Sequence, residues 1–208
     1  MVIAQDLQNL RLIEIKRMID MGGELMLNVF GDASIEAYGA VAYISNTFES
    51  NLVFSRARVA PLKALTLPQL ELTALTMAVR IAKYVAEIFS KEVQFKGINI
   101  WSDSMISLAW LTCNKKLPTF VKNRVEEIKT SLPNANFMHV TGNQNPADLL
   151  SRGISLEKLR NNKVWWHGPT WIIGMNMETS IQCLHMETAG NIKEASKDVS
   201  IINSGICE

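Results

Sequence analysis

Cysteine and histidine are scarce in this chain, with three of each among its 208 residues. Cys113, Cys183 and Cys207 are odd in number and far apart, so they form neither a disulfide framework nor a C-x₂-C pair. This usage indicates a reducing compartment. The cysteines and histidines together give none of the ligand spacings that zinc sites use. The sequence therefore excludes a disulfide-rich secreted scaffold and predicts no zinc.

Long apolar runs and excess charge are also missing. No stretch approaches the roughly 18 apolar residues of a membrane span, and the charged N-terminus has no signal-peptide core. We therefore expect an intracellular protein, cytoplasmic or nuclear, with no membrane partner. The formal net charge is +1, so any nucleic-acid binding must come from local basic patches and not from bulk charge.

What the chain does have is the composition of a globular protein, since 48% of its residues are hydrophobic. Its length predicts one domain of about 150 residues with extensions. We predict an N-terminal linker or helix over residues 1–22, an α/β domain over 23–155, a Trp-rich extension over 156–173 and a disordered tail over 174–208.

The hydrophobic pattern predicts the element order βββαβααβα. Three short-looped strands open the domain as an antiparallel meander, and later strands alternate with helices, which favours parallel pairing. This predicts a five-stranded mixed sheet, antiparallel in strands 1–3 and parallel in strands 4–5, flanked by helices. Thr119 is the expected N-cap of one of those helices. The expected strands are 25–30, 38–44, 52–59, 98–101 and 137–141, and the expected helices are 69–91, 105–112, 119–130 and a last one from Pro146.

Four carboxylates stand among apolar or small residues, where an unpaired charge is costly. They are Asp32, Glu71, Asp103 and Asp148. Taken singly, each is better explained as a turn, cap or helix-dipole residue. Taken together, they end a first strand, begin a helix, end a fourth strand and begin a late helix. Four converging carboxylates repel unless a cation is present, and hard oxygen ligands suit Mg²⁺ or Mn²⁺.

Two stretches, residues 52–70 and 104–125, carry basic residues and no acids. The second stretch interleaves its cations with Trp110 and Phe120. A solvated surface is the usual fate of such side chains, and contact with a nucleic-acid backbone is the alternative. The candidates for that contact are Lys115, Lys116, Lys122 and Arg124.

Several motifs occur together in one order, and with them the sequence resembles the ribonuclease H domain of retroelement polyproteins, most closely the BEL/Pao class of LTR retrotransposons. The resemblance covers roughly residues 10–172. The motifs are Phe30-Gly31-Asp32-Ala33-Ser34, Ala37-Tyr38-Gly39-Ala40, Ser55-Arg56-Ala57-Arg58-Val59-Ala60-Pro61-Leu62-Lys63, Thr66-Leu67-Pro68-Gln69-Leu70-Glu71-Leu72, Trp101-Ser102-Asp103-Ser104, Phe120-Val121-Lys122-Asn123-Arg124-Val125 and Asn145-Pro146-Ala147-Asp148-Leu149-Leu150-Ser151-Arg152-Gly153.

The resemblance implies a ribonuclease H-like fold and endonucleolytic cleavage of the RNA strand of an RNA–DNA hybrid. Two Mg²⁺ ions, or Mn²⁺, would be held by the four acids. Two metal ions at such a site activate water and stabilise the leaving oxygen. A reverse transcriptase would precede this domain in the parent polyprotein, and the Trp-rich extension would lead toward an integrase. The residues expected at the substrate are Ser34, Gly39, Ser104, Asn143, Arg152 and the four basic residues 115, 116, 122 and 124.

Two departures from the family pattern bear on activity. The loop Gly142-Asn143-Gln144-Asn145 lacks the histidine that relatives often carry, and Gln69 stands where a basic residue is expected beside Glu71. The alternative to an active enzyme is therefore a catalytically weak or inactive nucleic-acid-binding relic. An integrase-type nuclease is disfavoured, because those enzymes order their acids Asp, Asp, Glu.

Overall fold

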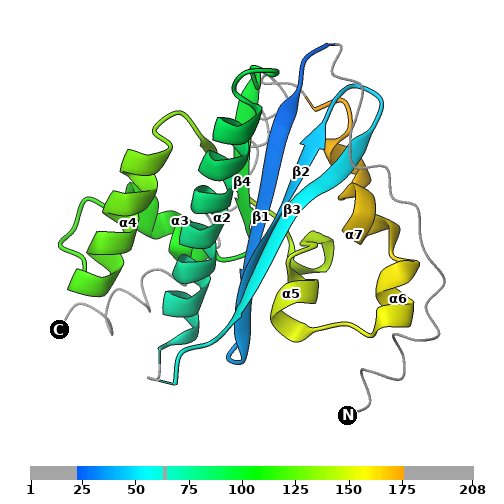
Figure 1. Ribbon diagram of the computed structural model, residues 1–208. Coiled ribbons are helices and arrows are strands. Elements are labelled where there is room, and N and C mark those ends of the chain that lie inside the picture. The colour runs from blue at the N-terminus through cyan, green and yellow to red at the C-terminus, as the bar shows by residue number, and fades with distance from the viewer. Residues whose placement is uncertain (1–22, 63–64, 176–208) are drawn as a thin grey trace. The chain divides into compact units, whose positions relative to one another are not determined.

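The structure is a computed structural model that describes residues 23–62 and 65–175. The predicted helix over 1–22 lies outside these residues, as does the predicted tail from 176 onward. In chain order the elements are β1 (Met26–Ala33), β2 (Ala37–Ser45), β3 (Ser50–Val59), α2 (Leu67–Phe89), β4 (Gly97–Ser102), α3 (Met105–Thr112), α4 (Thr119–Ser131), β5 (Asn136–His139), the 3₁₀ turn η1 (Gly142–Gln144), α5 (Asp148–Arg152), α6 (Leu156–Arg160), α7 (Lys163–His167) and the 3₁₀ turn η2 (Thr170–Ile172) (Figure 1).

One sheet of five strands organises the fold, in the order β3-β2-β1-β4-β5. The pairs β1–β2 and β2–β3 are antiparallel, and the pairs β1–β4 and β4–β5 are parallel. The predicted mixed sheet is therefore confirmed. None of the helices in the described part of the chain has the length and apolar character needed to cross a bilayer.

The predicted element boundaries differ from the observed ones at a few ends. Helix α2 begins at Leu67, which places Pro68 in its first turn, where a missing N–H costs nothing. The predicted N-cap role of Thr119 is wrong, because Thr119 is the first residue of α4 and Pro118 holds the cap position without a side-chain bond. The fifth strand begins one residue before Phe137 and ends at His139.

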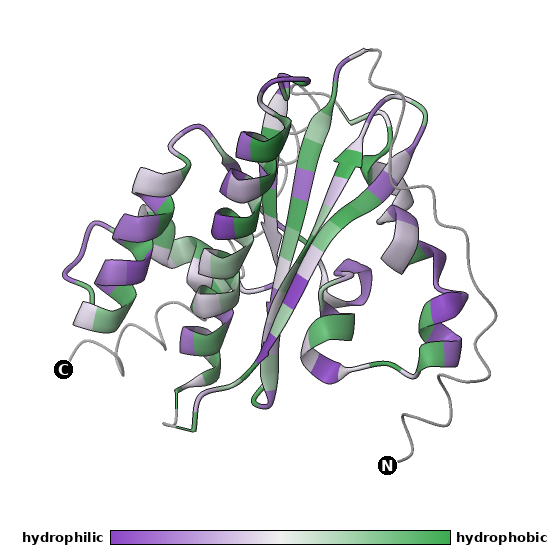
Figure 2. Ribbon diagram, viewed as in Figure 1, coloured by the Kyte–Doolittle hydropathy of each residue, from purple (hydrophilic) through white to green (hydrophobic). Residues whose placement is uncertain are grey.

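Strand β1 lies at the centre, and all eight of its residues are buried. Side chains alternate between the two faces of a strand, so each face of β1 needs its own cover. Figure 1 shows α2, α3 and α4 on one side of the sheet and α5, α6 and α7 on the other. Figure 2 shows largely hydrophobic central strands and a more hydrophilic α4 at the outside. Leu27 and Val29 belong to the core cluster that α2 completes.

The second face is covered by aromatic residues of the Trp-rich segment. Trp171 packs against Trp101 and Phe30, with ring centroids 4.6 Å and 6.0 Å away. The hydroxyl of Tyr43 donates to the carbonyl of Trp165 at 2.9 Å. Residues 156–173, predicted as an extension, thus pack directly on the sheet.

The same packing continues past the predicted start of the disordered tail. The N–H of Gly174 donates to the carbonyl of Asn46 at 2.9 Å, and Met175 is buried. The prediction of disorder from residue 174 is therefore wrong for these two residues, since a backbone bond and an apolar contact hold them.

A row of buried amides crosses the second face. Asn28 donates to Ser45 Oγ at 3.0 Å and accepts from Asn99 Nδ2 and Trp101 Nε1, both at 3.1 Å. Asn99 in turn accepts from Asn136 Nδ2 at 3.0 Å. These bonds fix the register of four neighbouring strands, β2, β1, β4 and β5, because a slip of one residue would leave buried amides unpaired.

Candidate active site

The first two acids meet at one edge of the sheet. Asp32 is the penultimate residue of β1, and Asp103 directly follows β4. These strands are parallel neighbours, with Gly31 paired to Ser102, so their carboxyl ends lie side by side. The predicted position at the strand ends is confirmed, and this is the edge where open α/β sheets place their ligands.

Glu71 reaches this edge from the other layer of the fold. It lies two residues further into α2 than predicted, and so in the second turn, because the helix starts at Leu67. The hydroxyl of Ser104 donates to Glu71 Oε2 in a very short hydrogen bond. Ser104 is also the N-cap of α3, where its oxygen accepts from the N–H of Ser107 at 3.2 Å. Ser104, the residue that follows Asp103, therefore holds the carboxylate of Glu71.

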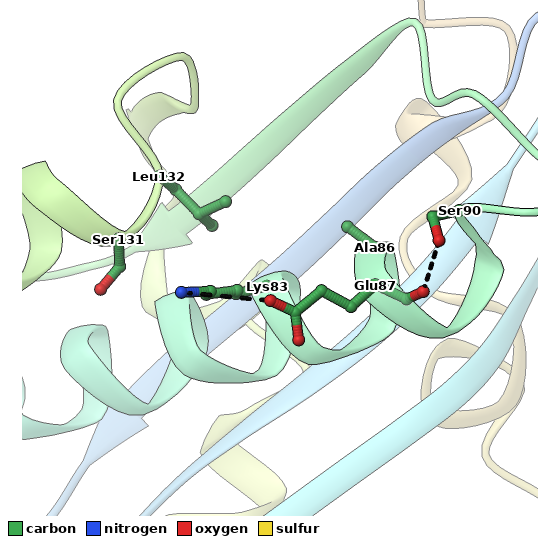
Figure 3. Close-up of a pocket in the computed structure, with 6 residues that line it drawn as sticks. All are labelled: Lys83, Ala86, Glu87, Ser90, Ser131 and Leu132. Atoms are coloured by element: carbon green, nitrogen blue, oxygen red, sulfur yellow. Dashed lines mark hydrogen bonds and ion pairs between the residues drawn. The ribbon is translucent and has the colours of Figure 1, made fainter.

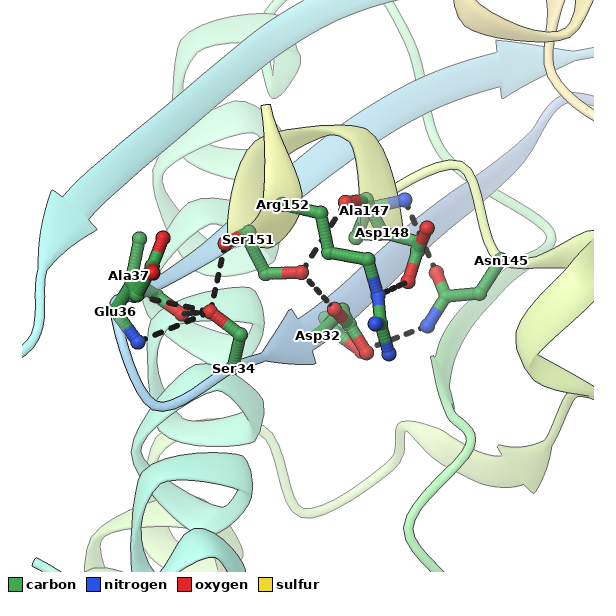
Figure 4. A network of polar contacts seen from close by, with 10 residues as sticks. Asp32, Ser34, Glu36, Ala37, Asn145, Ala147, Asp148, Ser151 and Arg152 are labelled. Atoms are coloured by element: carbon green, nitrogen blue, oxygen red, sulfur yellow. Dashed lines mark hydrogen bonds and ion pairs between the residues drawn. The ribbon is translucent and has the colours of Figure 1, made fainter. Parts of the chain in front are cut away.

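The fourth acid is supplied by α5, a helix of five residues on the second face of the sheet. Asp148 opens α5 and forms an ion pair with Arg152, with 2.5 Å between Oδ1 and Nε. The hydroxyl of Ser151, on the same helix, donates to Asp32 Oδ2 in a very short hydrogen bond. Figure 4 shows Asp32, Asp148, Ser151 and Arg152 grouped around the end of β1.

Burial and mutual repulsion make the charged forms of these acids unfavourable. Burial raises the pKa of Asp32 to about 7, opposed by the Ser151 hydrogen bond and reinforced by the charges of Asp103 and Asp148. The pKa of Asp103 is raised chiefly by burial, with the charges of Glu71 and Asp148 adding to it. Burial likewise raises the pKa of Glu71, and the charge of Asp32 contributes. The charges of neighbouring acids thus contribute to the raised pKa values of Asp32, Glu71 and Asp103.

The donor chemistry of these residues fits a hard divalent cation. All four are carboxylates, which are the ligands that such cations prefer, and Asp148 among them forms an ion pair with Arg152. Within residues 23–62 and 65–175, however, no three acidic, histidine or cysteine side chains already stand close enough to hold a metal ion. The acids nevertheless affect one another's pKa values, because charges interact over longer distances than the length of a metal–oxygen bond. Glu71 and Asp148 would have to turn from Ser104 and Arg152 toward a cation, whereas Ser151 contacts only the Oδ2 atom of Asp32.

Three residues predicted at the substrate have internal partners instead. Ser34 donates to the carbonyl of Ser151 at 2.7 Å and accepts from the N–H groups of Glu36 and Ala37 within the β1–β2 turn. A Cβ on Gly39 would lie 2.7 Å from Leu150 Cβ, so this glycine admits α5. Ser104, as described above, is bonded to Glu71. Their contact with substrate remains a prediction.

The other predicted substrate residues lie at the surface. Asn143 is exposed in η1 and accepts from Thr141 Oγ1 at 2.7 Å, and Arg152 is exposed beside Asp148. Lys115 and Lys116 are exposed in the loop between α3 and α4. Lys122 pairs with Glu126 at 3.7 Å, and the guanidinium of Arg124 lies 5.1 Å from the ring centroid of Phe120.

Sequence reasoning missed two residues of the site. Ser151 is buried against Asp32, and Asn145 donates from Nδ2 to the carbonyl of Gly31 at 3.1 Å. Both belong to the motif that carries Asp148, but their partners lie 119 and 114 residues away in the chain. Only the residue types were visible in the sequence, and small polar side chains in a turn gave no indication of these partners.

An open groove of about 370 Å³ lies elsewhere, where the C-terminal ends of α2 and α4 meet (Figure 3). Ala86 in this groove stands 15 residues after Glu71, which is about 22 Å along the helix axis. The groove is therefore remote from the acids. It is lined by Lys83, Ala86, Glu87, Ser90, Ser131 and Leu132.

Similarity to solved structures extends over most of the described chain at low identity. Ribonuclease H1 of Halobacterium salinarum NRC-1 is 18% identical, with 62% of this chain and 96% of that chain covered and a TM-score of 0.45. LC11-RNase H1 in complex with an RNA/DNA hybrid is 19% identical, with 65% and 99% covered and a TM-score of 0.46. The foamy viral protease-reverse transcriptase with an RNA/DNA hybrid is 15% identical, with 71% and 22% covered and a TM-score of 0.45.

A comparison with curated protein sequences found no match. Comparison with family models found one for residues 2–104, the Pao retrotransposon-like RNaseH-like domain. That span runs through β1 to β4 and contains Asp32, Glu71 and Asp103. The match to this family model agrees with the five-stranded mixed sheet, which is a ribonuclease H-like fold.

Proposed function

We propose that this protein is a divalent-metal-dependent endonuclease from a retroelement polyprotein and that it cleaves the RNA strand of RNA–DNA hybrids. The observation that carries the proposal is the convergence of four carboxylates on the carboxyl end of β1, with the pKa of Asp32 raised to about 7. A cluster that disfavours its own ionisation is suited to a cation partner, and perturbed acids gather at functional sites.

The four acids share one role in this proposal. Asp32, Glu71, Asp103 and Asp148 would hold the metal, with Mg²⁺ as the expected ion and Mn²⁺ as a substitute. When bound, such ions activate water and stabilise the leaving oxygen of a phosphodiester. Arg152, already beside Asp148, supplies a cation for a substrate phosphate at the rim of the site.

The hybrid itself would be recognised by its shape and its 2′-hydroxyl groups. Lys115, Lys116, Lys122 and Arg124 lie on the α3–α4 loop and the first two turns of α4, where their charges are available to a phosphate backbone. Binding through these residues would weaken as salt concentration rises.

A catalytically weak nucleic-acid-binding relic is the second candidate. It is favoured by the bonds of Glu71 to Ser104 and of Asp148 to Arg152, and by the fact that, within the described residues, no three potential ligands stand close enough to hold a metal ion. Gln69 supports it too, because its side chain accepts from the N–H of Thr66 at 3.0 Å and so caps α2 in place of a phosphate-binding cation.

Cleavage of an end-labelled RNA–DNA hybrid in Mg²⁺ decides between these candidates. The wild-type chain should cut the RNA strand and leave duplex RNA and duplex DNA of the same sequence intact. Asp103→Asn, which keeps the shape of the side chain, should lower the rate by several orders of magnitude while leaving hybrid binding intact. Hybrid binding without cleavage by the wild type would establish the relic instead.

A further inference from the structure

Ser151 occupies a buried position between the first and fourth acids. Its side chain is 2% exposed, and its hydroxyl faces both Asp32 Oδ2 and the carbonyl of Asp148, which is 3.2 Å away. A hydroxyl has one proton to donate, and a carboxylate is the stronger acceptor. The proton therefore belongs to the bond with Asp32.

The helix that carries Ser151 is tied to β1 on one side of that bond and to the β1–β2 turn on the other. The Ser151 carbonyl accepts from Ser34 Oγ at 2.7 Å, and Asn145, just before the helix, donates to the Gly31 carbonyl at 3.1 Å. A helix of five residues has little stability of its own, so these contacts decide where it lies. Figure 4 shows the three bonds around the end of the strand.

We propose that Ser151 is a positioning residue, which fixes the Asp32 carboxylate by one oxygen and sets Asp148, one helical turn earlier, at a defined place beside it. This inference rests on the proposed function, because it assigns a role in the same metal site. One oxygen of Asp32 is held by the serine, which orients the other. Residues that orient metal ligands in this way typically contribute roughly 10- to 100-fold in metal affinity.

The test measures Mn²⁺ binding by calorimetry without nucleic acid, so that it does not depend on cleavage. We compare wild type with Ser151→Ala, which removes the donor, and Ser151→Thr, which keeps it. Ser155→Ala is the matched control, since the exposed Ser155 hydroxyl caps α6 and bonds to the N–H of Lys158 at 3.4 Å. If Ser151→Ala fails to fold, Ser151→Cys keeps the volume with a much weaker donor.

We expect Ser151→Ala to raise the Mn²⁺ dissociation constant by roughly 10-fold or more, Ser151→Thr to restore most of the affinity, and Ser155→Ala to leave it unchanged. Equal affinity of Ser151→Ala and wild type would overturn the inference, as would a loss that Thr does not rescue. So would a wild-type chain that binds no Mn²⁺. The hybrid assay decides the proposed function separately, since a chain that binds Mn²⁺ through Ser151 and cuts nothing would overturn that function alone.

Discussion

Asp32 carries its charge in an unfavourable place, because it is buried among the other acids and its pKa is raised to about 7 from 3.8. Between these values the metal-free folded chain binds a proton at Asp32 that the unfolded chain has released. The free energy of unfolding must therefore fall as pH rises from about 4 to about 7. The raised pKa values of Asp103 and Glu71 act in the same direction.

Asp32→Asn should remove most of this dependence. The amide has no charge to desolvate, and its Oδ1 can still accept the Ser151 hydrogen bond. At pH 7 without metal we expect the variant to be more stable than wild type, by on the order of 2–4 kcal/mol. Urea unfolding at pH 5 and pH 7, with EDTA, measures this difference. A variant markedly less stable than wild type at pH 7 would show that Asp32 is a structural residue.

At the scale of elements, α5 depends on a glycine in the neighbouring strand. Gly39 pairs with Asp32 across the β1–β2 ladder, and its missing side chain makes room for Leu150. A Cβ there would lie 2.7 Å from Leu150 Cβ and 2.9 Å from the carbonyl oxygen of Arg56. Both distances are too short for contacts of a carbon atom, so α5 or the edge strand β3 would have to shift.

Gly39→Ala should therefore destabilise the fold by about 1–3 kcal/mol and displace α5. Because α5 carries Asp148 and Ser151, Mn²⁺ affinity should fall as well. Chemical denaturation measures the first effect and calorimetry the second. Unchanged stability and affinity would mean that α5 is not seated against β2 as described.

The elements were largely predictable from the sequence, whereas the contacts between them were not. Alternating apolar residues and short polar turns define β1 to β3, and Pro68 places the start of α2 to within two residues. The roles of Ser104 and Ser151 depend on tertiary neighbours, and a serine beside an acid has no distinctive pattern. Burial of Gly39 against Leu150 is invisible for the same reason, since 111 positions separate the two residues (150 − 39). The four acids were found only because their order and spacing resembled one family.

At the scale of the whole molecule, the sheet needs cover on both faces. Residues 156–175 supply part of that cover on the second face, over Phe30, Tyr43 and Trp101. Burying each such aromatic side chain contributes roughly 1.5–3 kcal/mol, against a total stability of about 5–15 kcal/mol for an ordinary domain. Removal of residues 156–175 would thus lower the free energy of unfolding of the domain by most of its total.

We expect a chain that ends at residue 155 to lose cooperative unfolding and to bind the dye ANS through its exposed aromatic face. A chain that ends at residue 175, which keeps the segment, should unfold cooperatively. Near-ultraviolet circular dichroism and urea titration of the two truncated chains make the comparison. Equal stability of both chains would contradict the packing role of the Trp-rich segment.

The pair Trp101 and Trp171 also gives the protein an optical signal of its own. The two indoles meet with centroids 4.6 Å apart and planes at 67°, although 70 positions separate them in the chain (171 − 101). Transition dipoles that are close and inclined couple, so the pair should produce a split circular dichroism band and altered emission. That band reports whether the segment after the last acid is seated on the sheet. Seating of this segment can then be followed in solution without any label, while metal or hybrid is added.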